Sequence, residues 1–247
     1  MPELYSNEPA ASHRGACTVR RVTPADDRRL PGSPREVSRF LDVAYAHQRA
    51  VGGCITRLRP YICPFEELLR RLPPDSSVLD VGCGVGIMSA LGAGPGRARS
   101  VTGFDISQRA IEIARGVKLP SGGSMTFHAL PAGEFPSGRF DVVLCIDVLH
   151  HVPPVAQSDF LRSVLDRVIS GGLLIFKDIS PRPWWKALAN HLHDLIVARQ
   201  WVHYRHEREV VAQMRGLGGD VIEEVRLDRL WYSHYLVCCR KPLPSSL

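Results

Sequence analysis

The chain has 247 residues, of which 45% are hydrophobic and 23% are charged. This length and composition fit one large folded domain or two small ones and exclude a chain that is disordered throughout. The net charge of +6 invites a nucleic-acid interpretation. However, the basic residues are scattered singly with no run of five or more, which favours an ordinary arginine-rich protein without a nucleic-acid partner.

The seven cysteines are odd in number and irregularly spaced, and no C-x-x-C pair occurs. This pattern supports neither a zinc site nor a disulfide framework, so we expect reduced cysteines, no metal and a cytoplasmic protein. The N-terminal sequence lacks the apolar segment of a signal peptide. No apolar run approaches the roughly 18 residues that a membrane span needs, so we expect no membrane span.

The N-terminal third of the chain predicts an arm followed by helices. Residues 1–33 are rich in proline, serine, arginine and aspartate and have no period, which predicts a flexible arm. A Ser-Pro pair begins a helix predicted over residues 33–53, and prolines bound a second helix over residues 64–74. We expect these helices to form a cap that covers residues 34–76.

From residue 77 the pattern changes to strands that alternate with helices, which is typical of βαβ units and a parallel sheet. A long helical insert is expected over residues 180–206. Helices are expected at 86–94, 107–117, 155–169 and 207–217, and strands at 77–82, 100–107, 124–130, within 140–152, at 170–180, 220–227 and 233–241.

The stretch SVLDVGCGVG (residues 77–86) carries glycines 82, 84 and 86 directly after a strand. Glycines at such a turn let a ligand approach the backbone at a helix N-terminus. The spacing G-x-G-x-G differs from the G-x-G-x-x-G of dinucleotide sites, and Asp80 would be a poor neighbour for a pyrophosphate. An acid there suits a cationic group, such as the ammonium of an amino acid.

A second acid, Asp105, closes the next strand about twenty residues past the glycines, where a carboxylate can accept both ribose hydroxyls. An adenosine with ribose hydroxyls, no phosphate and an amino-acid tail satisfies both acids. That ligand is S-adenosylmethionine (SAM), with S-adenosylhomocysteine (SAH) as its product.

Four segments carry a family resemblance: VLDVGCGVG, VTGFDIS, GRFDVVLCIDVLHHV and ISGGLLIFKDI. In order and spacing they resemble the class I SAM-dependent methyltransferases, in the small-molecule branch that includes the ubiquinone and menaquinone biosynthesis enzymes. The resemblance covers about residues 64–180 and, more weakly, 207–240. It implies an α/β, Rossmann-like, doubly wound, mostly parallel sheet of seven strands with helices on both faces, formed by residues 77–247. The stretch RPWWKALANHLHDLIVARQW is faintly similar to methyltransferases of aryl-polyene and pigment-lipid pathways.

The resemblance also implies which residues contact the cofactor. Family members often have an acid shortly after the third strand that faces the adenine. That place falls on Ala129 here, so we expect backbone atoms or Glu134 to serve instead. The implied contacts are Asp80, Gly82, Cys83, Gly84 and Gly86 for the methionine end, Asp105 for the ribose, Ile106 and Leu130 for the adenine, and Cys145 and Ile146 on the sulfonium side.

The segment after the fourth strand, IDVLHHV, is expected to face the transferred methyl group in the family. Histidine suits proton removal near neutral pH, so His150 or His151 is a candidate base, although either can also merely shape the loop. Asp147 is expected to orient a histidine or to contact the substrate. We expect both histidines to be unable to face the pocket at once, because they are adjacent.

The insert carries an apolar, aromatic stripe with a basic edge, which includes Trp184, Trp185 and Arg182. It predicts a lid over an aromatic or lipid-like acceptor that bears a negative group, or alternatively packing against the sheet. We expect methyl transfer, O- or C-methylation favoured, to a free or carrier-bound small acceptor in secondary-metabolite or pigment biosynthesis, by a monomer or a homodimer. The alternatives are an RNA or DNA methyltransferase, a non-catalytic subunit with this fold, and a nicotinamide enzyme.

Overall fold

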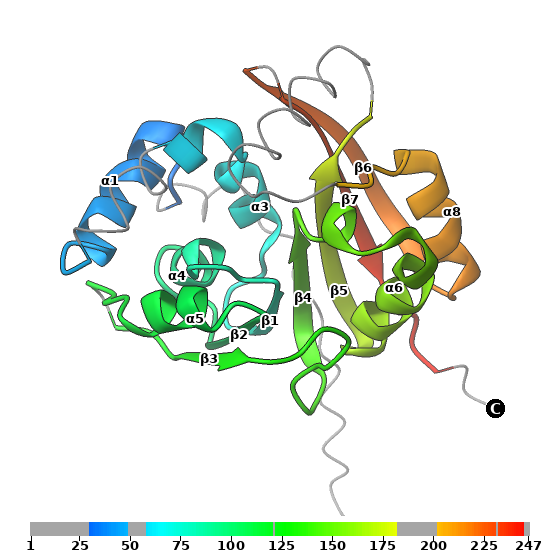
Figure 1. Cartoon of the computed structure of the whole chain (residues 1–247), viewed down its shortest axis with the longest axis horizontal. Helices are drawn as coiled ribbons and strands as arrows, with labels where there is room; N and C mark the ends of the chain where they lie inside the picture. Colours follow the sequence, from blue (N-terminus) through cyan, green and yellow to red (C-terminus); the bar gives the residue numbers. More distant parts are fainter. Residues whose placement is uncertain (1–29, 49–57, 121, 182–201, 231, 245–247) are drawn as a thin grey trace, which may run out of the picture.

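The computed structural model describes residues 30–48, 58–120, 122–181, 202–230 and 232–244 (Figure 1). Most of the expected N-terminal arm and most of the expected insert lie outside these residues. A seven-stranded sheet in the order β3-β2-β1-β4-β5-β7-β6 forms the centre of the described structure. The strands are β1 (Ser77–Val81), β2 (Ser100–Asp105), β3 (Met125–Ala129), β4 (Phe140–Ile146), β5 (Val168–Ile179), β6 (Asp220–Arg229) and β7 (Tyr232–Arg240).

Strands β1 to β5 run parallel, whereas β7 runs antiparallel to both β5 and β6. The strand order reverses between β1 and β4, where a doubly wound sheet opens a crevice at the carboxyl ends of its strands. Asp80 pairs in register with Gly103 of β2 on one side and with Leu144 of β4 on the other. The carboxyl ends of these three strands therefore meet at one edge.

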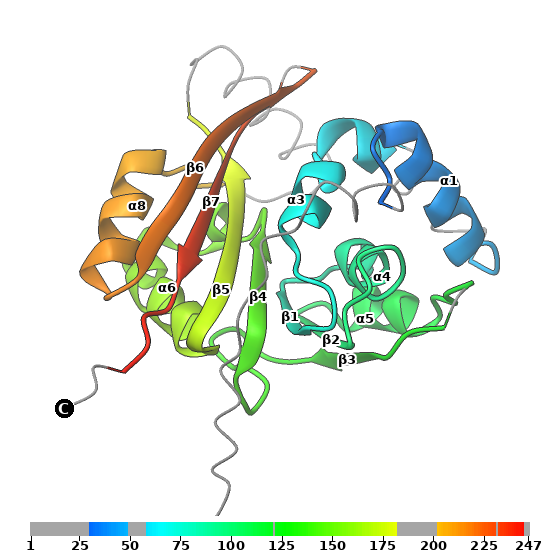
Figure 2. The ribbon, with the colours of Figure 1, turned by 180° about the vertical axis from the view of Figure 1, so that it is seen from behind.

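Helices cover both faces of the sheet, as views from opposite sides show (Figures 1 and 2). Helices α1, α3 and α4 bury residues such as Leu41 and Leu69 against one face, and α5 packs beside them. Helices α6 and α8 bury Val164 and Met214 against the other face. The predicted α/β, Rossmann-like, doubly wound fold is confirmed. The helices are α1 (Pro34–Ala44), α3 (Phe65–Arg71), α4 (Ile87–Ala93), α5 (Gln108–Arg115), α6 (Gln157–Asp166) and α8 (Glu207–Gly216).

Helix α1 begins where it was predicted, because the Ser33 hydroxyl caps a backbone amide of its first turn. The prediction of a much longer helix is wrong, since α1 ends at Ala44 and residues 45–47 form a turn. At this turn the buried Tyr45 donates a 2.7 Å hydrogen bond from its hydroxyl to the Val85 carbonyl of the glycine loop. This tertiary contact outweighs the helical pattern of the sequence.

Strand β5 is longer than predicted. The sequence predicts a strand over residues 170–180, but β5 begins at Val168, so Gly171 and Gly172 lie well inside it. Gly171 adopts a φ of +80°, and the pairing with β4 shifts register between Phe140 and Val142. A Cβ atom on Gly172 would lie 2.8 Å from the Asp141 carbonyl oxygen. The glycines therefore serve an irregularity and a close backbone approach inside the strand.

In the part of the chain that the structure describes, no helix is long and apolar enough to cross a membrane. Residues 58–62 are helical and directly precede α3. We refer to residues 34–48 and 58–72 as the cap. The boundaries expected for the arm, the cap and the main domain, and the role of the insert as a lid, stay predictions.

Candidate active site

The loop between β1 and α4 carries the three glycines in left-handed conformations, with φ of +64° at Gly82, +53° at Gly84 and +83° at Gly86. Each therefore favours glycine. A Cβ atom on Gly82 would lie 2.6 Å from Val148, and one on Gly86 would lie 3.2 Å from Phe127. A Cβ atom on Gly84 would meet nothing within 4 Å. Gly84 therefore borders open space, as a loop that receives a ligand requires.

Asp80 at the end of β1 is 2% exposed and accepts a 2.6 Å hydrogen bond from the Ser89 hydroxyl. Burial raises the pKa of its carboxyl from 3.8 to about 7, and the Ser89 hydrogen bond offsets only part of this rise. Among the described residues, no basic side chain contributes to lowering this pKa. A buried carboxyl without a basic partner is suited to bind a cationic ligand group, which would favour its ionised form.

Asp105 at the end of β2 is fixed beside the glycine loop. One carboxylate oxygen accepts a 2.9 Å hydrogen bond from the Gly84 amide, and the other accepts a 2.8 Å bond from the Ser107 amide. Next to it, Ile106 is 68% exposed, and the Leu130 amide donates to the Asp105 carbonyl. A carboxylate, a glycine backbone and an exposed apolar side chain together fit a sugar that carries a flat ring.

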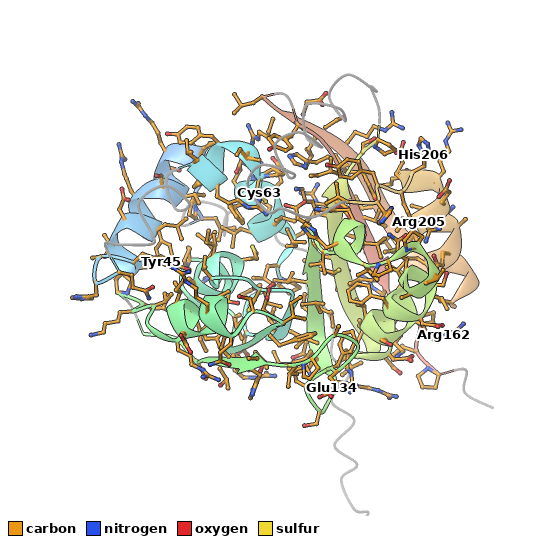
Figure 3. All side chains as sticks on the ribbon, viewed as in Figure 1. Tyr45, Cys63, Glu134, Arg162, Arg205 and His206 are labelled. Carbon is orange, nitrogen blue, oxygen red and sulfur yellow. The ribbon has the colours of Figure 1, made fainter. Side chains whose placement is uncertain are left out.

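Three residues that were predicted to lie near the cofactor, Cys145, Ile146 and Glu134, differ in how deeply they are buried. Cys145 is 0% exposed and packs in the core that faces α6 and α8, so only its backbone can line a ligand site. Ile146 is half-buried and packs against the opposite core. Glu134, labelled in Figure 3, is exposed at the surface. Its predicted contact with the adenine stays a prediction.

Asp147 follows β4 with a φ of +57°. Its carboxylate accepts a 2.6 Å hydrogen bond from the Lys177 ammonium of β5 and a 2.9 Å bond from the Arg59 guanidinium of the cap. Burial alone would raise the pKa of Asp147, but these two cations lower it well below its usual range. Asp147 therefore stays ionised and joins the cap to the carboxyl edge of the sheet.

The aspartate that contacts a histidine is Asp178, which follows Lys177 in β5. It forms a short hydrogen bond with His150 Nδ1, and it also accepts bonds from the backbone amides of His150 and Ile179. His150 is 3% exposed and lies 5.6 Å from the Tyr204 ring, measured between ring centroids, whereas His151 is exposed. The two rings lie 4.2 Å apart, measured between their centroids, and the printed hydrogen bond to Asp178 comes from the ring of His150. That the two histidines cannot both face the pocket stays a prediction.

Sequence reasoning missed Arg59, Lys177 and Asp178. For the last two a signal existed, since KDIS ends a buried strand whose carboxyl end lies at the same edge as Asp80 and Asp147. Arg59 comes from the cap and pairs across 88 positions of the chain, which no local pattern indicates.

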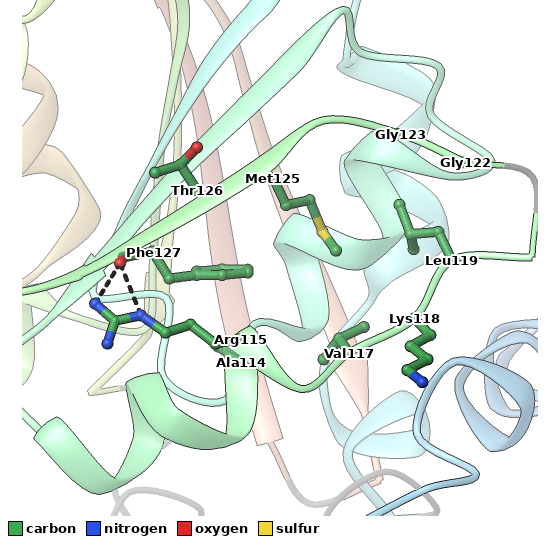
Figure 4. A pocket seen from close by; sticks show the side chains of 10 residues that line it. All are labelled: Ala114, Arg115, Val117, Lys118, Leu119, Gly122, Gly123, Met125, Thr126 and Phe127. Atoms are coloured by element: carbon green, nitrogen blue, oxygen red, sulfur yellow. Dashed lines mark hydrogen bonds between the residues drawn. The ribbon is translucent and has the colours of Figure 1, made fainter.

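A separate cavity of about 580 Å³ lies between the end of α5 and the start of β3 (Figure 4). Arg115 and Met125 are among its lining residues, and the Arg115 guanidinium is already bonded to the Phe127 carbonyl. Since it lies at the amino end of β3, this cavity is not part of the candidate site.

The strand order, the reversed β7, the glycine loop after β1 and the acid at the end of β2 together define a class I methyltransferase fold. A family model described as "Methyltransferase domain" matches residues 45–224. The chain belongs to this methyltransferase family, and the predicted resemblance is confirmed.

The chain is similar to the ubiquinone biosynthesis O-methyltransferase of Bordetella avium (strain 197N), with 36% identity over 109 residues, 43% of this chain and 44% of the relative. It therefore spans less than half the length of this curated relative. A solved structure of magnesium protoporphyrin IX methyltransferase from Synechocystis PCC 6803 with bound SAM has a TM-score of 0.59 and 20% identity, covering 86% of this chain and 98% of that one.

A second solved structure, of the 4+2 cyclase SpnF, has a TM-score of 0.58 and 16% identity, and covers 87% of this chain and 99% of that one. At these identities the two structures show the fold alone. Because a cyclase shares the fold, the fold does not by itself establish methyl transfer.

Proposed function

We propose that the chain is a SAM-dependent methyltransferase that acts on a small acceptor, with O-methylation favoured. The observation that carries the proposal is the buried Asp80 beside the glycine loop, whose carboxyl has no basic partner to offset its burial in the described structure. The ammonium of SAM supplies the missing cation. Asp105, already bonded to Gly84, has further lone pairs for the ribose hydroxyls, and the exposed Ile106 suits the adenine ring.

SAM, when bound, supplies an activated methyl group on a sulfonium. Asp80 would hold its amino-acid end and Asp105 its ribose, beside the ends of β4 and β5 where an acceptor could be positioned. His150 would take the proton that the acceptor hydroxyl loses when that oxygen is methylated. Asp178 holds His150 Nδ1, which orients the ring and stabilises the imidazolium that results.

The acceptor that we propose is aromatic or lipid-like, free or carrier-bound, as the aromatic insert suggested. The name of the Bordetella avium relative supports an oxygen as the methylated atom. The five described cysteines are free, which supports the proposal that the protein works in the cytoplasm. A place in secondary-metabolite or pigment biosynthesis, and a monomeric or homodimeric state, belong to the same proposal.

Two measurements test the function. Calorimetry should show that SAH binds and that NAD does not. Methyl transfer from SAM with a labelled methyl group should appear in catechol or 3,4-dihydroxybenzoate and not in RNA. If SAH does not bind, the whole proposal fails. If SAH binds but no hydroxyl compound is labelled, a non-transferring role, such as that of the cyclase, is favoured instead.

The Asp105→Ala variant tests the ribose assignment. We expect it to weaken SAH binding at least about 100-fold, because both the ribose contacts and the anchor of the Gly84 amide are lost. Calorimetry measures the affinity, and a thermal melt checks the fold. SAH affinity within threefold of the unmodified protein would remove this assignment.

Two glycine variants distinguish a loss of folding stability from a loss of SAH affinity. Gly82→Ala should lower stability by about 2–3 kcal/mol, because its Cβ would strike Val148 in a left-handed conformation. Gly84→Ala should cost only about 1–2 kcal/mol of backbone strain, since its Cβ meets nothing within 4 Å. If the open space beside Gly84 receives the cofactor, Gly84→Ala should nevertheless lose SAH affinity about 10-fold or more. Thermal melts and calorimetry on both variants check the pair.

A further inference from the structure

The side chain of Gln157, the first residue of α6, is buried and contacts three backbone carbonyls from two separate segments. It is 2% exposed, and its amide nitrogen lies 3.1 Å from the Leu149 oxygen, 3.0 Å from the Val152 oxygen and 3.3 Å from the His203 oxygen. A carbonyl can only accept, so the amide nitrogen, and not the amide oxygen, must face this group. The nitrogen carries two protons, which the three carbonyls share.

Two of these carbonyls lie on either side of His150 in the chain. The segment after β4 forms a single 3₁₀ turn, η2 (Leu149–His151), and no side chain caps its start. Gln157 bonds to the first residue of this turn and to Val152, which follows its last residue. Asp178 binds the backbone amide and the ring of the histidine itself. The turn is therefore held by one side chain from α6 and by another from β5.

The third carbonyl belongs to the segment that leads into α8. The His203 amide donates a 2.8 Å hydrogen bond to the His150 carbonyl, and the His203 carbonyl accepts from Gln157. The next residue, Tyr204, places its ring 5.6 Å from the His150 ring, measured between the ring centroids. Gln157 thus also fixes the segment that packs an aromatic ring against the histidine.

An amide is the side-chain group that suits these three carbonyls, because it supplies two N–H donors from one uncharged nitrogen. The carboxylate of a glutamate would turn acceptors toward acceptors. An apolar side chain of the same length would remove both donors from a buried group of acceptors, which is costly. The turn that carries His150 therefore depends on donors that lie outside its own short helix.

We propose that Gln157 is a positioning residue for methyl transfer: it holds the turn so that the His150 ring stays bonded to Asp178 and its Nε2 stays aimed at the acceptor. The inference rests on the proposed function, in which His150 takes the proton. A base must lie within hydrogen-bond reach of the proton that it takes, and a displacement of about 1 Å can cost about 100-fold in rate. Because three carbonyls occupy its nitrogen, Gln157 acts through His150 and not on the acceptor.

Two variants of Gln157 keep the length of the side chain and change its donors. Gln157→Met removes both N–H donors. Gln157→Glu keeps one O–H donor while its carboxyl is protonated and loses that donor when the carboxyl ionises. Val164→Ala is the matched control, because Val164 lies on the same helix with 0% exposure, and its replacement weakens the packing of α6 without removing a hydrogen bond.

We expect Gln157→Met to lower kcat for catechol at least about 10-fold, while KM and SAH affinity stay within about threefold. Gln157→Glu should fall between the unmodified protein and Gln157→Met at about pH 6 and lose further activity relative to the unmodified protein at about pH 9. Val164→Ala should melt at a lower temperature but keep kcat within about threefold. If Gln157→Met loses no more kcat than Val164→Ala, Gln157 only stabilises the fold and the inference is overturned.

A spectroscopic measurement tests the same role without turnover. In protein with nitrogen-15-labelled histidine, the Nδ1 proton of His150 should exchange slowly with water, because it is bound to Asp178 in a buried place. Gln157→Met should speed this exchange at least about 10-fold, whereas Val164→Ala should leave it within about threefold. Equal exchange in the two variants overturns the inference and leaves the cofactor assignment intact. An unmodified protein that binds no SAH or transfers no methyl group overturns the proposed function instead.

Discussion

Replacing Asp80 with asparagine should weaken SAH binding strongly and, at the same time, make the ligand-free protein more stable above pH 7. Asparagine can still accept the hydrogen bond from Ser89 but cannot pair with an ammonium. We expect SAH affinity to fall at least about 100-fold at pH 8, the size of loss typical when one partner of a buried charge pair is removed. Calorimetry of the variant and the unmodified protein at pH 8 measures it.

The protonation of Asp80 makes the stability of the ligand-free protein fall as the pH rises. Because burial raises the pKa of Asp80 from 3.8 to about 7, the folded state holds the proton more tightly than the unfolded state. Its contribution to stability is fully present below about pH 4 and is lost as the pH rises through about 7. The loss reaches about 4 kcal/mol by pH 8, so Asp80→Asn should melt several degrees higher than the unmodified protein there and equally at pH 4.

Asp141 at the start of β4 provides a matched control. Burial alone would raise the pKa of this carboxyl, but hydrogen bonds from Ser77 and the charge of Arg99 lower it overall. Asp141→Asn should therefore reduce stability at neutral pH, the opposite of Asp80→Asn, and leave SAH binding unchanged. If both variants shift stability in the same direction, the account of Asp80 as a carboxyl without a basic partner is wrong.

Most of the fold could be predicted because strand and helix signals alternate clearly after residue 77. Two strand ends carry the acids Asp80 and Asp105, which we propose contact the cofactor, and both could be placed from their spacing to the glycines. What could not be predicted depends on tertiary contacts. Helix α1 stops at Ala44 since the Tyr45 hydroxyl bonds to the glycine loop, and no residue near Ala44 signals that stop.

The polar residues at the carboxyl ends of β4 and β5 also could not be paired from the sequence. Asp147 was predicted to orient a histidine or contact the substrate, but its hydrogen-bond partners are Lys177 and Arg59. The sequence around His234 predicts only a buried strand. His234 lies at the carboxyl end of β5 because β7 runs antiparallel to β5. Local patterns thus place residues on strand ends, whereas pairings across the cap and the sheet need the assembled structure.

Asp178→Asn should lower methyl transfer to catechol by about 10²–10⁴-fold while SAH affinity stays within twofold. The carboxylate of Asp178 now accepts the proton of His150 Nδ1, which leaves Nε2 able to take a proton from the acceptor. An asparagine amide can donate to Nδ1 instead, which would place the ring proton on Nε2 and prevent it from acting as a base. Rates with labelled SAM, measured across pH, test this.

The controls separate base catalysis from alignment. His151→Ala should keep nearly full activity, because the His151 side chain is exposed, whereas the ring of His150 is bonded to Asp178. His150→Gln should lose both the rate and the rise of the rate with pH on the acid side of the profile. If His150→Gln and Asp178→Asn both turn over within threefold of the unmodified protein, no base is needed. The His150–Asp178 pair would then only hold the turn after β4 against β5, and alignment of the acceptor with the sulfonium would account for the rate.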